Sequence, residues 1–224
     1  MARHPRGFDT ETAHAHLARR DRKLAAWMKR IGPIAPDPRW RKPFDPVDAL
    51  ARAILYQQLS GKAAATIVGR VEAAIASDRF HCDTLARCDD PTIRACGVSG
   101  NKLLALRDLA RREQAGEIPD LRRMATMDDD AIIAALVPVR GIGRWTVEMM
   151  LMFRLGRPDV LPVDDLGIRK GAQAVDKGET MPAPKALAER GERWGPYRTY
   201  ASLYLWRIAD TAGDAKAATK RSQD

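Results

Sequence analysis

Two glycines around one apolar residue constrain the fold of this chain more than any other short pattern. Gly141 and Gly143 bracket Ile142, and helical patterns of apolar residues lie on both sides of them. Glycine tolerates the left-handed backbone and the close approach that a tight turn between helices needs, and an apolar residue can fill the gap between the helices. The pattern therefore predicts a helical hairpin, with helices at about 129–136 and 144–155.

The rest of the chain also carries helix signals, without a convincing period-two strand pattern. Asp45 and Pro46 have the pattern of a helix N-cap and a first helical position, and Ser60-Gly61 marks where that helix ends. Apolar residues at helical spacing between positions 13 and 31 predict one N-terminal helix. Further helices are expected at 63–76, 102–115, 183–192 and 197–211, before a frayed tail at 213–224. We expect an all-α fold of about ten helices.

The charge of the chain favours a polyanionic partner. It has 38 Lys and Arg residues against 29 Asp and Glu, which gives a net charge of +9 at pH 7. Nucleic acid or an acidic membrane surface would suit this charge. A soluble basic protein without a polyanionic partner can have the same net charge, so that alternative stays open. No apolar run approaches the roughly 20 residues that span a bilayer, and no signal peptide precedes the helices. We expect a soluble, cytoplasmic protein.

The cysteines and histidines do not form a recognisable metal site. Cys82, Cys88 and Cys96 lack the Cys-x-x-Cys pairs of structural zinc sites, and the 4 histidines form no His-Glu-x-x-His pattern. We expect reduced thiols and no catalytic metal.

The glycine turn would present backbone N–H groups at the start of the second hairpin helix, where the helix dipole favours an anion such as phosphate. Arg140 and Arg144 would add positive charge without reading base sequence. Ordinary helix hairpins use glycine as well, so the turn alone leaves a purely structural role open.

A second motif, Pro162-Val163-Asp164-Asp165, stands directly before a helical pattern. An aspartate in that place often does no more than cap the helix, because its side chain accepts the N–H groups of the first turn. A catalytic carboxylate is the alternative, and it depends on the other motifs of the chain.

These motifs occur in an order that resembles the helix-hairpin-helix superfamily of DNA glycosylases. The motif L-x-P-V-R-G-I-G-R-W-T precedes L-P-V-D-D-L-G-I-R-K-G, as a hairpin precedes an essential aspartate in that superfamily. Two earlier blocks, Ile54 to Ser60 and Gly97 to Lys102, resemble its branch of 3-methyladenine DNA glycosylases II. The resemblance extends from about Asp45 to Ala212, and four motifs in the same order make it specific.

The resemblance implies two helical subdomains with an active-site cleft between them. The first is expected at 45–155 and contains the helix-hairpin-helix at about 129–155, while 1–44 and 156–224 form the second. The expected partner is double-stranded DNA with alkylated bases, bound by a monomer.

Site residues follow from the resemblance position by position. Asp164, directly after Pro-Val, corresponds to the catalytic aspartate, whereas Asp165 does not. Gln58 corresponds to the side chain that fills the gap left by a flipped nucleotide. The base pocket is expected to contain Tyr56, Trp145, Met149, Asp165 and Trp206. The DNA phosphates are expected to contact Gly100, Lys102, Gly141, Gly143, Arg144 and Thr146. The carbonyls of Val137, Val139 and Ile142 are expected to hold a Na⁺ or K⁺ ion.

The chain departs from its relatives at several positions. Trp145 stands where bifunctional members carry a lysine, so no Schiff base with the sugar can form at that position. Met149 and Asp165 stand where broad-specificity members often have tyrosines. No cysteine follows Cys96, so we expect no iron–sulfur cluster and no other cofactor. We also expect no substantial N-terminal β domain ahead of Asp45.

The resemblance thus implies a monofunctional DNA glycosylase that releases 3-methyladenine and 7-methylguanine and leaves an abasic site. Weak or no action on hypoxanthine is expected, because no general acid that would protonate a neutral purine stands out, although Asp165 stays open for that role. The leading alternative is a helix-hairpin-helix module that binds DNA without catalysis. Removal of oxidised or mismatched bases fits less well, since a lysine at position 145 is absent. If the protein is bacterial, we expect it at the nucleoid.

Overall fold

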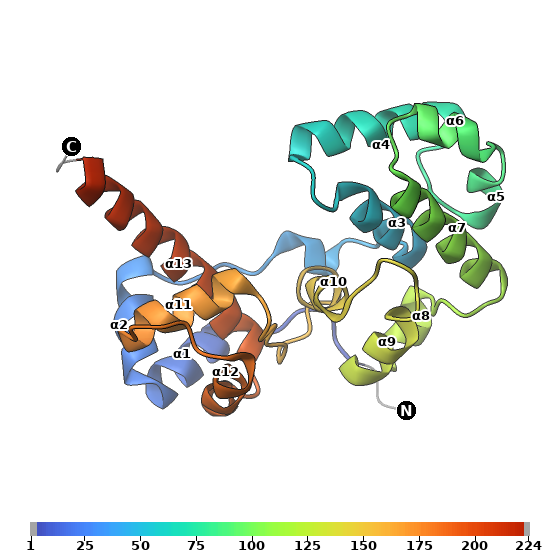
Figure 1. Cartoon of the computed structure of the whole chain (residues 1–224). Helices are drawn as coiled ribbons and strands as arrows, with labels where there is room; N and C mark the ends of the chain where they lie inside the picture. Colours follow the sequence, from blue (N-terminus) through green and yellow to red (C-terminus); the bar gives the residue numbers. More distant parts are fainter. Residues whose placement is uncertain (1–3, 222–224) are drawn as a thin grey trace. The chain divides into compact units, whose positions relative to one another are not determined.

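The computed structural model describes residues 4–221, with side chains up to Ala212, and this part of the chain contains only helices, turns and loops (Figure 1). The all-α class is therefore confirmed. Within these residues lie thirteen α-helices, two 3₁₀-helices and one π-helix. The number exceeds the expected one mainly because short helical turns such as α5 (Cys82–Leu85) and α8 (Leu121–Met124) have no sequence periodicity of their own.

The contacts of the chain divide it into two compact units. The first contains His4 and Pro43–Val147, and the second contains Pro5–Lys42 and the residues from Glu148 onward. This division falls inside helix α10 (Arg144–Met150). The subdomain ranges given above, 45–155 and 1–44 with 156–224, stay a prediction.

The first unit is built from helices whose starts follow local capping signals. Asp45 caps the first helix through the N–H of Asp48, at 3.0 Å, and Pro46 occupies the first helical position as predicted. Ser60 caps the next helix. The helices are α3 (Pro46–Tyr56), α4 (Gly61–Ile75), α5, α6 (Asp90–Ala95), α7 (Gly100–Gln114), α8, α9 (Asp129–Leu136) and the start of α10.

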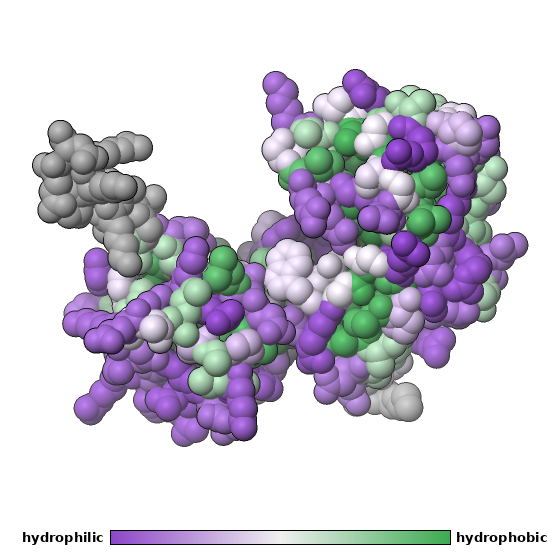
Figure 2. Space-filling view, viewed as in Figure 1, coloured by the Kyte–Doolittle hydropathy of each residue, from purple (hydrophilic) through white to green (hydrophobic). Residues whose placement is uncertain are grey.

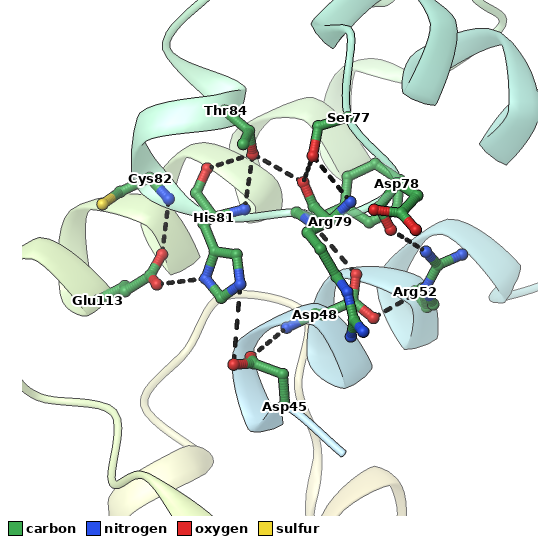
Figure 3. Close-up of polar contacts among 11 residues, drawn as sticks. Asp45, Asp48, Arg52, Ser77, Asp78, Arg79, His81, Cys82, Thr84 and Glu113 are labelled. Carbon is green, nitrogen blue, oxygen red and sulfur yellow. Dashed lines mark hydrogen bonds and ion pairs between the residues drawn. The ribbon is translucent and has the colours of Figure 1, made fainter. Parts of the chain in front are cut away.

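A polar cluster ties α3, the loop before α5 and α7 together in the first unit (Figure 3). The buried carboxylate of Asp48 accepts hydrogen bonds from the Phe80 N–H, at 3.2 Å, and from Arg52 Nε, at 2.9 Å. The ring of His81 lies 2.6 Å from Glu113 Oε1, and the other oxygen of Glu113 accepts the Cys82 N–H at 2.6 Å. These contacts satisfy polar groups that the packing of the helices removes from water.

The His81–Glu113 pair predicts a pH dependence of stability. Burial disfavours the charged ring, but the hydrogen bond to Glu113 and the nearby carboxylate of Asp45 raise the pKa of His81 above its ordinary 6.5. The charged pair therefore stabilises the fold fully below pH 6.5, and this contribution is lost as the pH rises through the higher folded pKa. We expect the melting-temperature difference between wild type and His81→Gln to shrink between about pH 6 and pH 8.5. A difference that stays constant over that range would contradict this role.

The second unit begins with two helices where the sequence predicted one. The chain breaks at Asp21, between α1 (Thr10–Arg20) and α2 (Arg22–Ile31). The backbone of Asp21 is extended, and its carboxylate caps the N–H groups of Lys23 and Leu24. The same carboxylate accepts the indole N–H of Trp194 at 2.9 Å and pairs with Arg190 at 2.7 Å. The prediction of a single helix was wrong. The partners of Asp21 are distant in sequence, and together with the cap they outweigh the continuous apolar spacing that favours one helix.

The core of the second unit combines aliphatic side chains with large aromatic ones. Trp194, Tyr200 and Tyr204 are among its most deeply buried side chains. The Tyr200 hydroxyl donates to the carbonyl of Ile34 and accepts its N–H, both at 3.0 Å. Trp40 is also buried, and its indole donates to the carbonyl of Met152 at 2.7 Å. Polar partners of this kind are needed when large aromatic side chains leave water.

The other helices of the second unit are η1 (Pro38–Arg41), the π-helix η2 (Leu151–Leu155), α11 (Leu166–Asp176), α12 (Pro184–Gly191), η3 (Glu192–Trp194) and α13 (Arg198–Arg221). Helices α11 and α13 pack extensively against each other. Helix α13 continues beyond the expected end at residue 211. A frayed tail was predicted at 213–224. The side chains from residue 213 and the backbone from residue 222 lie outside the described part of the chain.

The face drawn in Figure 2 carries mainly hydrophilic residues, and smaller hydrophobic areas interrupt them on both units. The large hydrophobic side chains that are exposed are Tyr56, Leu59, Leu104, Val137, Trp145 and Leu166. Within residues 4–221, no helix is both long enough and apolar enough to cross a membrane.

Candidate functional site

The predicted gap-filling residue occupies an unusual backbone position in the first unit. Gln58 lies between α3 and α4, is exposed, and has a φ of +57°. The left-handed conformation costs a residue with a Cβ about 1–2 kcal/mol, so the surrounding loop must hold it. Its neighbour Tyr56, at the end of α3, is 43% exposed. Both side chains are therefore accessible to a ligand on this unit.

The hairpin turn has the predicted conformation. Helix α9 ends at Leu136 and α10 begins at Arg144, and the helical backbone continues through η2 to Leu155. Gly141 has a φ of +79°, which only glycine adopts readily, and Ile142 is buried as the plug of the turn. The helices at 129–136 and 144–155 are thus confirmed.

A carboxylate that sequence reasoning missed fixes the turn from α7. Asp108 accepts the Arg140 N–H at 2.9 Å and side-chain hydrogen bonds from Arg111 and Arg112 at 2.8 and 2.9 Å. Burial alone would raise the pKa of Asp108, but these hydrogen bonds lower it to about 2. The group therefore keeps its charge at neutral pH and holds the turn to α7. Asp108 and Arg140 are 32 residues apart, so no local pattern in the sequence indicates their contact.

The lysine predicted to contact phosphate has partners within the protein. Lys102 Nζ donates to the carbonyl oxygens of Leu55 and Gln57, at 2.7 and 2.8 Å. The Gln57 amide in turn donates to the carbonyl of Gly141 at 2.8 Å. A phosphate contact of Lys102 stays a prediction. Its contact with the loop that carries Gln58 was not foreseen, and neither was the role of Gln57.

The other residues predicted to meet phosphate are accessible at helix starts. Gly100 begins α7, where Ser99 is the N-cap, and it is exposed. Gly143 is exposed, and a Cβ added to it would meet no atom within 4 Å. The Arg144 guanidinium is exposed and lies 3.5 Å from Asp130, while Thr146 is half-buried in the first turn of α10. Trp145, also in this turn, is 48% exposed.

In the second unit, a hydrogen bond joins one of the two adjacent aspartates to a predicted pocket aromatic. Asp165 caps α11 through the Ile168 N–H at 2.8 Å. The same oxygen accepts the indole N–H of Trp206, from α13, also at 2.8 Å. Asp165 is half-buried, whereas Asp164 is exposed and has no described hydrogen bond or ion pair. The structure thus brings Asp165 and Trp206 together.

The Trp206 indole is fixed from other sides as well. Phe153 stacks with it at a centroid distance of 5.8 Å, and the guanidinium of Arg39 lies 4.6 Å from the Phe153 ring centroid. At Gly167, an added Cβ would approach Trp206 Cδ1 to 2.7 Å. A residue with a Cβ at position 167 would displace the Trp206 indole, so glycine is needed there. Met149, the remaining predicted pocket residue, is half-buried in α10.

Comparison with known proteins shows the family of the chain. A sequence profile of the HhH-GPD superfamily of base excision DNA repair proteins matches residues 51–196. The chain belongs to this superfamily. Within it, DNA-3-methyladenine glycosylase 1 of Schizosaccharomyces pombe is 33% identical over 205 residues, which cover 91% of this chain and 90% of the relative.

Two solved structures of HhH-GPD relatives share the fold. A Schizosaccharomyces pombe 3-methyladenine DNA glycosylase in complex with abasic DNA is 33% identical, with a TM-score of 0.75 over 88% of this chain and 95% of the other. A DNA-3-methyladenine glycosidase of Bacillus halodurans is 35% identical, with a TM-score of 0.81 over 92% and 94%. The predicted family resemblance is therefore confirmed over nearly the whole chain.

Proposed function

We propose that this protein is a monofunctional DNA glycosylase that extrudes alkylated purines from duplex DNA and hydrolyses their N-glycosidic bond. The observation that carries the proposal is the hydrogen bond between Asp165 and the Trp206 indole at the start of α11. An aromatic face and a carboxylate in contact provide the two groups that such a reaction needs. The HhH-GPD relatives named for 3-methyladenine support the substrate class.

Trp206 would stack on the extruded base. An alkylated purine carries positive charge, and a cation over an indole face gains about 0.5–2 kcal/mol that a neutral purine does not. Phe153 stacks with the indole, and the hydrogen bond from the indole N–H to Asp165 fixes the orientation of the ring. The pocket would therefore recognise the charge of the lesion before any bond breaks.

The carboxylate would stabilise the positive charge that develops on the sugar and orient the attacking water. Purines alkylated at N3 or N7 leave as neutral bases, so no general acid is required. The family resemblance assigned this role to Asp164. We propose Asp165 instead, because it is half-buried and contacts the pocket aromatic, while Asp164 is exposed. One oxygen of Asp165 accepts two N–H groups, which fix the orientation of the carboxylate.

Reaction would stop at the abasic site. Strand cleavage by bifunctional members requires an amine that forms a Schiff base with the sugar. Position 145 carries a tryptophan in this chain, and its exposed indole suits stacking and not covalent chemistry.

The hairpin would hold the DNA backbone. The exposed turn at Gly141 and Gly143, with Arg144 beside it, presents N–H groups and charge to phosphate. The carbonyls of Val137, Val139 and Ile142 are oxygen donors of the kind that alkali cations prefer, and a bound ion would add positive charge beside the phosphate. We propose that the protein acts wherever chromosomal DNA lies, which is the nucleoid if the source is bacterial.

Gly143→Ala provides a test of this contact. The methyl group meets no protein atom within 4 Å, so the fold should stay intact, but it would obstruct a phosphate that approaches the backbone. We expect an unchanged melting temperature and weaker binding to undamaged duplex DNA, measured by fluorescence anisotropy. Gly69→Ala, on α4, also enters open space and should bind DNA as the wild type does. Equal binding by both variants would argue against a backbone contact at Gly143.

The proposed activity is tested by base release from duplexes that each contain one lesion. We expect release of 3-methyladenine and 7-methylguanine, with little or no release of hypoxanthine, and abasic strands that stay intact until alkali is added. Efficient hypoxanthine release would contradict the narrow specificity. DNA binding without release of any base would favour a non-enzymatic binding module.

A further inference from the structure

We propose that Lys102 and Gln57 are positioning residues that hold the Gln58 loop ready to enter the space left by an extruded nucleotide. The inference rests on the proposed function and concerns residues of the first unit only. Neither residue has to touch DNA for this role. They would act through the backbone of the loop.

Lys102 secures the end of α3. The last carbonyl groups of a helix have no partner within it, and a cation beside them also complements the helix dipole. Lys102 Nζ binds the carbonyls of Leu55 and Gln57, at 2.7 and 2.8 Å. These carbonyls lie on either side of Tyr56, where the helix stops and the loop begins. Burial lowers the pKa of Lys102, as expected for an ammonium group turned toward the protein.

Gln57 connects the same loop to the hairpin. Its amide donates to the carbonyl of Gly141 at 2.8 Å. Helix α7 contacts both the loop and the hairpin. Lys102, in its first turn, binds the loop, and Asp108, further along the helix, accepts the Arg140 N–H of the hairpin. The loop, the hairpin and α7 therefore form a closed frame of hydrogen bonds.

This frame explains the backbone of Gln58. A residue with a Cβ keeps a φ of +57° only when its surroundings fix it. Lys102 and Gln57 fix the loop on one side of Gln58, and Ser60, the N-cap of α4, fixes it on the other. An exposed side chain on a loop that is already ordered loses less conformational entropy when it enters the base stack.

The test compares Lys102→Met with wild type on two duplexes. For a 7-methylguanine in a normal base pair, we expect the single-turnover rate of base release to fall roughly tenfold to a hundredfold. For the same lesion opposite an abasic-site analogue, extrusion is easy and the rate should fall much less. Lys102→Arg keeps a cationic donor and should recover part of the rate. Lys62→Met removes a charge from the exposed start of α4 and should not distinguish the two duplexes.

Two further measurements separate positioning from a phosphate contact. The double variant Lys102→Met/Gln58→Ala should be no slower than Gln58→Ala alone, because both changes disable one element. For Lys102→Met, the slope of log DNA affinity against log salt concentration should stay at the wild-type value. A slope reduced by about one, or a double variant with additive losses, would overturn the proposal in favour of a phosphate contact.

Gln57→Ala and the fluorescence of a base analogue provide two further tests. Gln57→Ala should reproduce the selective loss on paired lesions even if Lys102→Met fails to fold, and its failure to do so would count against the frame. Fluorescence of 2-aminopurine reports extrusion without any chemistry. If the wild type extrudes this base but releases no lesion, the proposed function fails. The positioning role is still supported if Lys102→Met lowers the signal, and it is refuted if the signal is unchanged.

Discussion

Asp165→Asn is expected to lower the rate of base release by about a thousandfold, the loss typical of removing a principal electrostatic group from an active site. Asparagine keeps an oxygen that accepts the N–H groups of Ile168 and Trp206, so the start of α11 and the pocket aromatic should stay in place. Only the negative charge is lost. The measurement is single-turnover release of 7-methylguanine from duplex DNA, with binding followed separately by anisotropy.

Asp164→Asn is the matched control, since it removes the same charge from the adjacent, exposed residue. We expect it to keep most of the activity and the normal melting temperature. The opposite pattern, with loss only in Asp164→Asn, would return the catalytic role to the aspartate that the family resemblance indicated. Full activity in both variants would exclude a mechanism based on either carboxylate.

Gly171→Ala is expected to have the largest effect on stability. Gly171 lies on α11, and an added Cβ would overlap the backbone of Leu205 on α13, with the carbonyl carbon at 2.6 Å and Cα at 2.8 Å. Backbone atoms cannot turn aside as a side chain does, so the two helices would have to separate. Overpacking of this kind costs roughly 3 kcal/mol, or about 6–12 °C in melting temperature for a chain of this size.

The same separation would disturb the candidate site, because α11 carries Asp165 and α13 carries Trp206. We therefore expect base release to fall together with the melting temperature, measured by circular dichroism. Gly69→Ala provides the contrast. It lies in α4 with open space around it, and alanine there should stabilise the helix by about 0.5–1 kcal/mol. A Gly171→Ala variant as stable as wild type would show that α11 and α13 can adjust.

The sequence predicted elements whose causes are local. Asp45 with Pro46 specifies a helix start, and Ser60 with Gly61 marks the break between α3 and α4, through hydrogen bonds and φ preferences that act within three or four residues. The glycine turn and its buried Ile142 follow from the same kind of short-range chemistry. Such signals depend little on the rest of the molecule.

The break at Asp21 has causes that are distant in sequence. Its apolar neighbours have continuous helical spacing, and the residue breaks the helix because Arg190 and Trp194 meet its carboxylate. Their positions follow from how the second unit packs. No pattern near Asp21 contains that information.

The sequence by itself determined the helical class, the hairpin and the family, because capping, turn chemistry and motif order are properties of neighbouring residues. Only the tertiary structure placed Asp165 against Trp206 and gave Lys102 a partner. Trp206 meets Asp165 because α11 and α13 pack together, and Lys102 reaches the end of α3 because α7 lies beside it. Contacts between residues far apart in sequence depend on the packing of whole helices, and that packing sets which side chains of the site meet.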